Sequence, residues 1–280
     1  MKTKVFIISC ISAFLFALNV NAQKSCCVLN PNSMEALASN ESFKADHLSP
    51  IPFELKDQAG KMITFKAADG TPANAYYIPA KTQSQRTLLV FHEWWGLNDY
   101  IKQEAQKWQT ELGDVNVFAV DLYDGQVATT PEEAGALMGK LDGDHARAII
   151  SGLLAYAGKD QQIVTLGWCM GGTWSFEAAL LAGKNAKACV MYYGFPEENQ
   201  EKISKLKTNV LYVHGTQDAY ISAEAVGKFA EGVKKSGNTI SVESYDAVHA
   251  FANPSNPQFD KENATDAATK AKVFLAKALK

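Results

Sequence analysis

Three side chains whose types suit nucleophilic catalysis occur in the order cysteine, aspartate, histidine. Cys169 stands in "GWCMG", residues 167–171, which has the spacing G-x-S-x-G with cysteine in the serine position. A thiol attacks as its thiolate, and a helix N-terminus and a neighbouring imidazole both favour that charge. His249 could accept and return the proton, while Asp218 would hold the other ring nitrogen and select the tautomer. These residue types in this order predict covalent catalysis through an acyl-enzyme.

The three candidates all follow segments that are typical of buried strands. Cys169 follows "IVTLGW", Asp218 lies after "NVLYVHG", and His249 lies after "TISVESY". Sites in open parallel sheets lie at the carboxyl ends of the strands, so the three loops are expected to meet at one edge. The glycines at 167 and 171 suit a nucleophile on a strained turn from strand to helix, because they permit unusual backbone angles and close helix packing.

The rest of the chain alternates apolar runs with amphipathic segments, which is typical of parallel strands joined by crossover helices. "MITFKA" and "NAYYIP" flank the turn residues 69–72 and predict a hairpin. We predict an α/β fold with an open, mostly parallel eight-stranded sheet and helices on both faces. The other six strands are expected at "TLLVFH", "NVFAVDL", "IVTLGW", "KACVMYYG", "NVLYVHG" and "TISVESY", and the helices at about 100–112, 145–156, 170–182, 223–235 and 262–280.

Composition favours one large globular domain. The chain has 280 residues, of which 47% are hydrophobic and 20% charged, so it can bury one sizeable core. This balance excludes disordered, collagen-like and disulfide-rich proteins. The formal net charge is −3, and the only arginines are Arg86 and Arg147. Neither nucleic acid nor an anionic membrane surface is an expected partner.

The N-terminus has the pattern of a secretory signal peptide over residues 1–22. Two lysines precede an apolar stretch at 5–20, which ends in the small-residue site Val20-Asn21-Ala22. A retained membrane anchor is the alternative, but the apolar run is short for a spanning helix. We therefore expect a periplasmic or secreted protein without stable membrane insertion after cleavage. The mature chain would comprise an N-terminal arm at 23–50 and one domain at 51–280.

The cysteines do not form a disulfide framework. Cys10 would leave with the signal peptide, and Cys189 lacks a glycine frame and is expected in the core. Cys26 and Cys27 could cross-link two chains, bridge as an adjacent pair or stay reduced. A lipid anchor at Cys26 is disfavoured by the preceding Gln23 and Lys24.

From about Met62 onward the sequence resembles the dienelactone hydrolase family, cysteine hydrolases with the α/β-hydrolase fold. The motifs that carry the resemblance are "HEWWGLND", "VDLYDG", "GWCMGG", "HGTQD" and "YDAVHAFAN", in family order. The resemblance implies hydrolysis of small-molecule esters or lactones. It also implies that Glu93 contacts the resting cysteine and helps to convert it to the thiolate. The backbone N–H of Met170 is expected in the oxyanion hole, and the resemblance adds the N–H of Trp94.

The sequence departs from the best-known members of that family at two arginines that hold the substrate carboxylate. One should follow the histidine by four residues, where this chain has Asn253, and the other belongs in a stretch that here, at 126–144, has no arginine. Burying an anion without a paired cation costs several kcal/mol. The substrate is therefore expected to be neutral. Trp95, Tyr123 and Phe251 are candidates for binding it.

Other residues compete for these roles. His47, His92, His145 and His214 are rivals of His249, although His214 precedes a glycine at a strand end and is expected to brace the acid loop. Asp246 is the rival acid, but it lies too near His249 in sequence. Asp121 belongs to no group with metal-ligand spacing, so neither a metal nor another cofactor is expected. The alternative function is a non-catalytic small-molecule binding protein that retains the fold.

Overall fold

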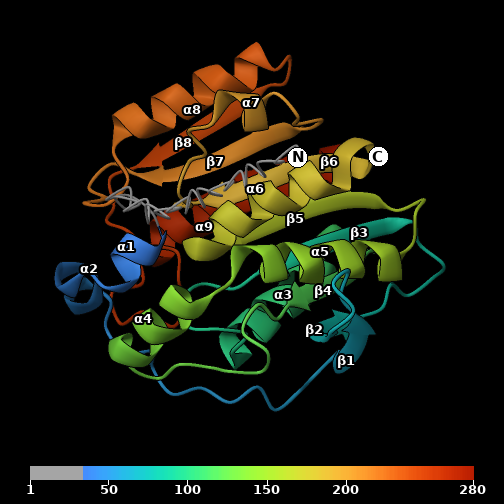
Figure 1. Cartoon of the computed structure of the whole chain (residues 1–280), viewed down its shortest axis with the longest axis horizontal. Helices are drawn as coiled ribbons and strands as arrows, with labels where there is room; N and C mark the ends of the chain where they lie inside the picture. The colour runs from blue at the N-terminus through green and yellow to red at the C-terminus, as the bar shows by residue number, and fades with distance from the viewer. Residues whose placement is uncertain (1–33) are drawn as a thin grey trace, which may run out of the picture.

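The computed structural model describes residues 34–280, and these form one eight-stranded sheet between two layers of helices (Figure 1). The predicted signal peptide, Cys26 and Cys27 lie outside the described residues. The strand order is β1-β2-β4-β3-β5-β6-β7-β8. β1 and β2 form the predicted antiparallel hairpin, β2 pairs antiparallel with β4, and all later neighbours are parallel. The strands are β1 (Lys61–Lys66), β2 (Pro72–Ile78), β3 (Arg86–Phe91), β4 (Asn116–Val120), β5 (Gln162–Trp168), β6 (Ala186–Tyr192), β7 (Asn209–Gly215) and β8 (Ile240–Tyr245).

Helices cover both faces of the sheet, as predicted. α5 and α6 pack on one face, together with α8, whose Phe229 meets Phe176 of α6 edge-on. α3 and α9 pack against each other on the opposite face (Figure 1). The helices are α1 (Met34–Ala38), α2 (Glu41–Asp46), α3 (Asp99–Leu112), α4 (Pro131–Lys140), α5 (Gly143–Ala157), α6 (Met170–Ala182), α7 (Gln200–Ile203), α8 (Ala223–Lys235) and α9 (Lys261–Ala278), with a 3-10 turn at Gly183–Asn185.

The sequence analysis did not predict α4, although its start carries a strong local signal. Thr130 and Glu133 form a capping box, with proline at the first helical position. Two glycines inside the ten-residue helix lower its intrinsic helix propensity. Gly135 has a packing reason, because a Cβ there would lie 2.6 Å from the carbonyl oxygen of Ala38. The glycine therefore lets α1 pack closely on α4.

The core runs along the central strands. β3 and β5 are buried along almost their whole length, as expected for parallel strands covered on both faces. Cys189 lies in this core, as predicted, with its Sγ 3.6 Å from Ser175 Oγ. Burial raises the pKa of the Cys189 thiol to about 11, so this thiol stays protonated.

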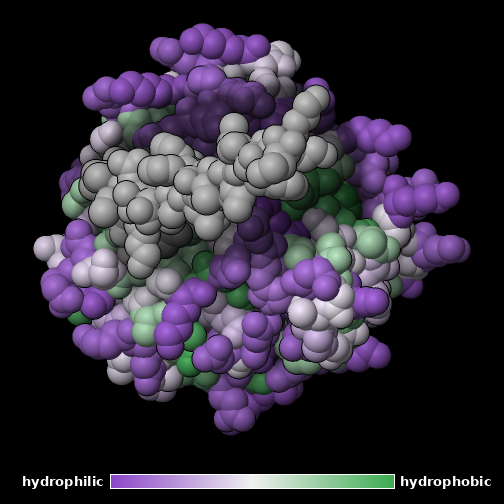
Figure 2. All heavy atoms as spheres, viewed as in Figure 1, coloured by the Kyte–Doolittle hydropathy of each residue, from purple (hydrophilic) through white to green (hydrophobic). Residues whose placement is uncertain are grey.

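The surface over α8 is dominated by hydrophilic side chains, as the top of Figure 2 shows. Exposed large hydrophobic residues elsewhere on the described chain include Tyr156, Leu181 and Val273, which lie on α5, α6 and α9. None of the helices within residues 34–280 combines the length and the apolar character that a membrane-spanning helix requires.

Residues 34–50, the described part of the predicted N-terminal arm, fold against the domain. α1 packs on α4, and the backbone N–H of Ile51 donates to the Ser255 carbonyl at 3.0 Å. Phe43 of α2 is fully buried. This segment is therefore part of the folded unit, and α2 lies over the loops that follow β7 and β8.

Candidate active site

Cys169 lies on a strained turn between β5 and α6. Its φ of 53° is in the left-handed region, which residues other than glycine rarely adopt. A Cβ at Gly167 would lie 2.0 Å from the Gly171 carbonyl oxygen, and one at Gly171 would lie 2.4 Å from that of Phe91. Both positions therefore require glycine. The Cys169 N–H donates to the Tyr192 carbonyl at 2.9 Å, which fixes the turn to the neighbouring strand β6.

The structure brings His249 and Asp218 together, although they lie on different loops. His249 Nδ1 is 2.7 Å from Asp218 Oδ2. The other carboxylate oxygen accepts from the backbone N–H groups of Tyr220 at 2.8 Å and Ile221 at 3.0 Å. Burial pulls the pKa of Asp218 upward, yet His249 and these hydrogen bonds hold it below its usual value. Asp218 is therefore an anion that orients the imidazole.

Cys169, His249 and His47 form one buried cluster. Their potential ligand atoms all lie within 4.8 Å of one another. His249 Nε2 is buried, and none of the described residues gives it a hydrogen bond. Burial pulls the pKa of His249 downward, but Asp218 and Cys169 outweigh it and raise that pKa to about 10. This environment favours an imidazolium at His249, beside the Cys169 sulfur.

The Glu93 carboxyl is buried beside this cluster and has two partners. Tyr193 Oη donates to one oxygen at 3.4 Å, and the Asn253 side-chain amide donates to the other. The side-chain oxygen of Asn253, Oδ1, in turn accepts from Ser255 N at 2.8 Å and Ser255 Oγ at 2.7 Å. Burial raises the pKa of Glu93 to about 8, against the opposing effects of His249 and Tyr193. Asn253, which replaces the expected arginine, thus holds Glu93.

The predicted oxyanion-hole residues border the same place. Met170 is the first residue of α6, where backbone N–H groups have no intrahelical partners. Trp94 is 1% exposed and meets the ring of Phe43 edge-on. The structure places both residues at the carboxyl edge of the sheet.

The predicted substrate-binding side chains lie in different surroundings. Tyr123 Oη donates to Met170 Sδ at 3.2 Å, beside the elbow. Trp95 is buried and packs on Trp94. Phe251 lies against the rings of Tyr193 and Tyr245. Their role in substrate binding stays a prediction.

His47 is a residue that the sequence analysis did not place in the site. It follows α2, and its Nδ1 lies 2.6 Å from the Phe43 carbonyl oxygen. Its ring centroid is 5.4 Å from that of His249. Burial and the charge of His249 lower the pKa of His47 to about 3, so the ring is neutral at ordinary pH. Sequence gave no signal for this contact, because it joins segments about two hundred residues apart without a motif.

The remaining candidates have structural partners. His214 Nε2 lies 3.0 Å from the Ile221 carbonyl, so His214 braces the acid loop, as predicted. Asp246 accepts from Gln217 Nε2 at 2.7 Å instead of meeting His249. His92 bonds to the backbone of Glu93 and Leu122, and His145 lies 2.7 Å from Asp69. Asp121 accepts from the backbone of Tyr123 and Gly125, which closes the turn after β4.

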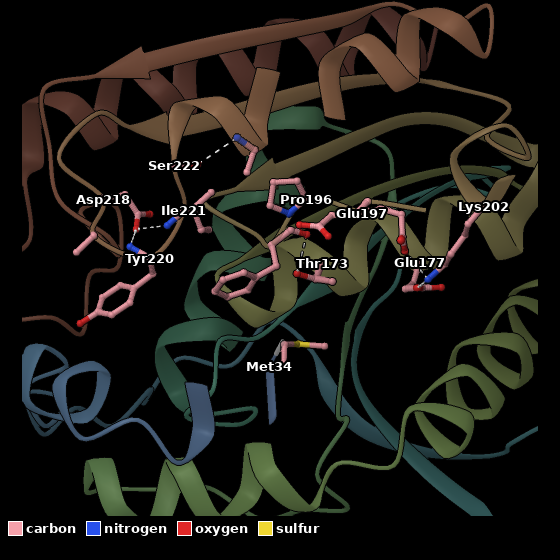
Figure 3. A pocket seen from close by; sticks show the side chains of 14 residues that line it. Met34, Thr173, Glu177, Pro196, Glu197, Lys202, Asp218, Tyr220, Ile221 and Ser222 are labelled. Carbon is pink, nitrogen blue, oxygen red and sulfur yellow. Dashed lines mark hydrogen bonds and ion pairs between the residues drawn. The ribbon is translucent and has the colours of Figure 1, made fainter. Parts of the chain in front are cut away.

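Two cavities lie on either side of Tyr220. The smaller, of about 270 Å³, is lined by His249, His47 and the end of α2. The larger, of about 550 Å³, contacts Asp218 and extends toward Glu177 and Lys202, which lie at its far end in Figure 3. The smaller cavity is lined by His249 and the larger by Asp218, whereas Cys169 lines neither of the two.

Comparison with known proteins identifies the family of the chain. Residues 73–279 match the model of the dienelactone hydrolase family. The chain is 28% identical over 234 residues to a protein of Aquifex aeolicus (strain VF5) with the provisional name carboxymethylenebutenolidase, covering 79% of this chain and 100% of that relative. It is 33% identical over 122 residues to the carboxymethylenebutenolidase of Pseudomonas sp. (strain P51), covering 43% of this chain and 50% of the other.

Solved structures share the fold. One is a dienelactone hydrolase-like promiscuous phosphotriesterase from metagenomic libraries, with a TM-score of 0.63 and 20% identity over 79% of this chain and 99% of that one. Another is a Pyrococcus furiosus esterase, with a TM-score of 0.61 and 14% identity over 82% of this chain and 98% of that one. The matched family region begins at residue 73, so α1, α2 and His47 precede it.

Proposed function

Since the chain belongs to the dienelactone hydrolase family and is a hydrolase, we propose that it cleaves neutral esters or lactones through an acyl-enzyme on Cys169. The observation that carries this proposal is the position of Cys169. It lies on a strained elbow within 4.8 Å of a histidine whose other nitrogen is held by Asp218. That arrangement provides a nucleophile, a base and an orienting acid.

The reaction would proceed in two steps. In the first, the Cys169 thiolate attacks the acyl carbon, and the His249 imidazolium gives its proton to the departing alkoxide oxygen. In the second, His249 takes a proton from water as the water oxygen attacks the thioester, and collapse of the intermediate releases the acid and the Cys169 thiolate, which restores the thiolate–imidazolium pair. Asp218 keeps Nδ1 protonated throughout, so that Nε2 exchanges the proton. The N–H groups of Met170 and Trp94 would stabilise the oxyanion of both tetrahedral intermediates.

The preference for a neutral substrate rests on the charges around the site. Asn253 occupies the place of the expected arginine and is committed to Glu93 and Ser255. Among residues 34–280, no lysine or arginine lines the smaller cavity. Within the same range, the one lysine or arginine that lines the larger cavity is Lys202, which pairs with Glu177 and Glu197. A substrate carboxylate would therefore be buried without a free cation.

Glu93 fits this mechanism as a neutral acid in the resting site. With a pKa of about 8, its carboxyl group keeps its proton at neutral pH. A protonated Glu93 adds no negative charge beside the thiolate. Asn253 and Tyr193 hold it in place in that state.

Trapping of the acyl-enzyme tests the proposed mechanism. A p-nitrophenyl ester should give a burst of p-nitrophenol, and mass spectrometry of the quenched protein should find the acyl group on the peptide that contains Cys169. The same ester should protect Cys169 from iodoacetamide. An acyl group on Cys189, or turnover without any covalent adduct, would contradict the assignment.

We also propose that the protein is exported after cleavage following Ala22. The support is the pattern of two lysines, an apolar stretch and a small-residue site at residues 1–22. N-terminal sequencing of protein from a periplasmic extract should begin at Gln23. A first residue upstream of Gln23 would contradict this proposal.

A further inference from the structure

The cluster of Cys169, His249 and His47 contains more ligand atoms than the proposed hydrolysis uses. A thiol and two imidazoles meet within 4.8 Å, and all three residues are buried. They come from three remote parts of the chain: the elbow before α6, the loop after β8 and the end of α2. For this reason no ligand spacing is visible in the sequence.

Both imidazoles are oriented with one nitrogen free. His47 Nδ1 lies 2.6 Å from the Phe43 carbonyl, which can only accept, so Nδ1 carries the hydrogen and Nε2 a lone pair. His249 Nδ1 is held by Asp218 at 2.7 Å. Both Nε2 atoms are buried. That of His47 has no hydrogen-bond partner among residues 34–280, and that of His249 has the Cys169 sulfur beside it. Histidine ligands of zinc have this support, in which a carbonyl or carboxylate fixes the nitrogen that does not bind the metal.

We propose that Cys169, His249 and His47 bind Zn²⁺ and that the bound ion reversibly inhibits the hydrolase. One thiolate and two neutral imidazoles are ordinary zinc ligands, and three protein ligands leave a fourth position for water. Binding removes one proton from the Cys169–His249 pair, and no electron is transferred. The ion binds both the proposed nucleophile, Cys169, and the proposed base, His249, so turnover stops until the ion leaves.

The distances require only a small rearrangement. Ligand atoms around a tetrahedral zinc ion lie about 3.3–3.6 Å apart, given metal–ligand distances of about 2.0–2.3 Å. The three atoms here lie within 4.8 Å, so they would have to approach one another by about 1 Å. His47 follows the short helix α2, whose residues precede the matched family region at 73–279. The third ligand is therefore a contribution of this N-terminal segment.

Zinc affinity should depend on His47. We would measure competition with a chromophoric chelator, using the full chain with Cys26→Ser and Cys27→Ser so that those thiols cannot bind. We expect one tight Zn²⁺ per chain and a loss of affinity of at least tenfold in His47→Asn, because asparagine can keep the bond to the Phe43 carbonyl but lacks Nε2. The matched control is His145→Asn, at a histidine paired with Asp69 on the surface, which should leave the affinity unchanged.

Two measurements need no substitution at His47. Co²⁺ in place of Zn²⁺ should give a thiolate-to-cobalt charge-transfer band that disappears in Cys169→Ala. Zn²⁺ should also slow the alkylation of Cys169 by iodoacetamide at least tenfold, and a chelator should restore the rate. Absence of both effects would overturn the metal site even if the His47 variant failed to fold.

The outcomes separate this proposal from the proposed hydrolysis. Equal zinc affinity in the parent and in His47→Asn would show that the third ligand is wrong while leaving the acyl-enzyme mechanism intact. Retained esterase activity at saturating Zn²⁺ would overturn the inhibition. Tight, His47-dependent zinc binding without acylation of Cys169 would support the site and contradict the hydrolytic mechanism.

Discussion

Two regions of the chain meet at the active site. The sheet edge supplies Cys169, Asp218 and His249 from the ends of β5, β7 and β8, inside the matched family region. The segment of α1 and α2 supplies Phe43 and His47 from outside that region. The sheet topology therefore positions Cys169, Asp218 and His249, whereas the segment of α1 and α2 covers these side chains.

The two regions also differ in how they are held. Cys169 and Asp218 are fixed by the backbone, through the strained elbow at Cys169 and the N–H groups that bond Asp218. α2 is held by side chains, namely the ring contacts of Phe43 with Trp94 and Tyr220 and the bond from Tyr220 Oη to Asp46. We infer that α2 can be loosened by a single side-chain change, while the sheet edge cannot.

The largest expected effect is the loss of the nucleophile. Cys169→Ala should reduce kcat/KM for a p-nitrophenyl ester by at least about 10³-fold, while Tm changes little. Cys189→Ala is the matched control, because that thiol is equally buried but lies in the core. It should leave kcat/KM nearly unchanged and cost roughly 1–2 kcal/mol of unfolding free energy. Substantial activity in Cys169→Ala would contradict the assigned nucleophile.

The acid loop should give the next largest effect. Asp218→Asn should lower kcat by roughly 10²–10⁴-fold, because the imidazole remains but its tautomer and charge lose their support. Asp246→Asn should leave kcat almost unaltered, since Asp246 bonds to Gln217 instead. Steady-state kinetics of the two variants compares them directly. A larger loss in Asp246→Asn would mean that the acid has been assigned to the wrong loop.

These two regions also differ in how far sequence alone could predict them. Every strand of the sheet and the helices α3, α5, α6, α8 and α9 follow from periodicity and turn residues, and the family motifs point to the nucleophile, acid and histidine. The His214 brace followed from its place at a strand end. In each case the sequence signal lies within one short segment. The sheet topology then brings the ends of these segments together.

Two of the features that sequence reasoning missed are long-range contacts, and a third is a helix. His47 reaches His249 across about two hundred residues, and no periodicity or spacing records such a contact. Asn253 was recognised only as a missing arginine, although it bonds to Glu93. The helix α4 was missed despite its capping box, because its interior glycines obscure the helical pattern. Packing between distant segments, rather than local propensity, decides the contacts of His47 and Asn253.

Glu93, at the sheet edge, should make the free energy of unfolding depend on pH. The folded state holds the Glu93 proton up to a pKa of about 8, compared with 4.5 for an ordinary glutamate. Between pH 4.5 and about 8, folding is therefore accompanied by the uptake of a proton at Glu93. The stability that this protonation contributes is full below pH 4.5 and falls as the pH rises toward 8.

Urea unfolding at pH 5 and pH 8 tests this effect with Glu93→Gln, which stays neutral and can still accept from Asn253. The stability of the parent relative to Glu93→Gln should fall by at least about 1 kcal/mol between the two pH values. Glu224→Gln is the surface control, because Glu224 pairs only with Lys228, and should show no such fall. An equal pH dependence in parent and Glu93→Gln would argue against a neutral Glu93.

Charge selectivity should be more modest. We expect kcat/KM for a neutral lactone to exceed that for its carboxylated analogue by at least tenfold, about 1.4 kcal/mol in transition-state binding. Replacing Asn253 by arginine should not make the carboxylated lactone as good a substrate as the neutral one, because the new cation would pair with Glu93. Better turnover of the carboxylated lactone would mean that a cation reaches the pocket.

The smallest effect concerns the docking of α2. Tyr220→Phe removes the hydrogen bond from Tyr220 Oη to Asp46 but keeps the ring against Phe43. Such a bond contributes about 1 kcal/mol, so α2 should open more often and Cys169 should react with iodoacetamide about fivefold faster.

The control for Tyr220→Phe is Tyr245→Phe, which removes a similar tyrosine–aspartate bond, from Tyr245 Oη to Asp266 at 2.8 Å. That bond joins β8 to α9 rather than α2 to the acid loop. Its loss should therefore lower overall stability without changing the alkylation rate. Equal rates in both variants and the parent would show that α2 does not limit access to Cys169, because the reagent would then reach the thiol by a path that α2 leaves open.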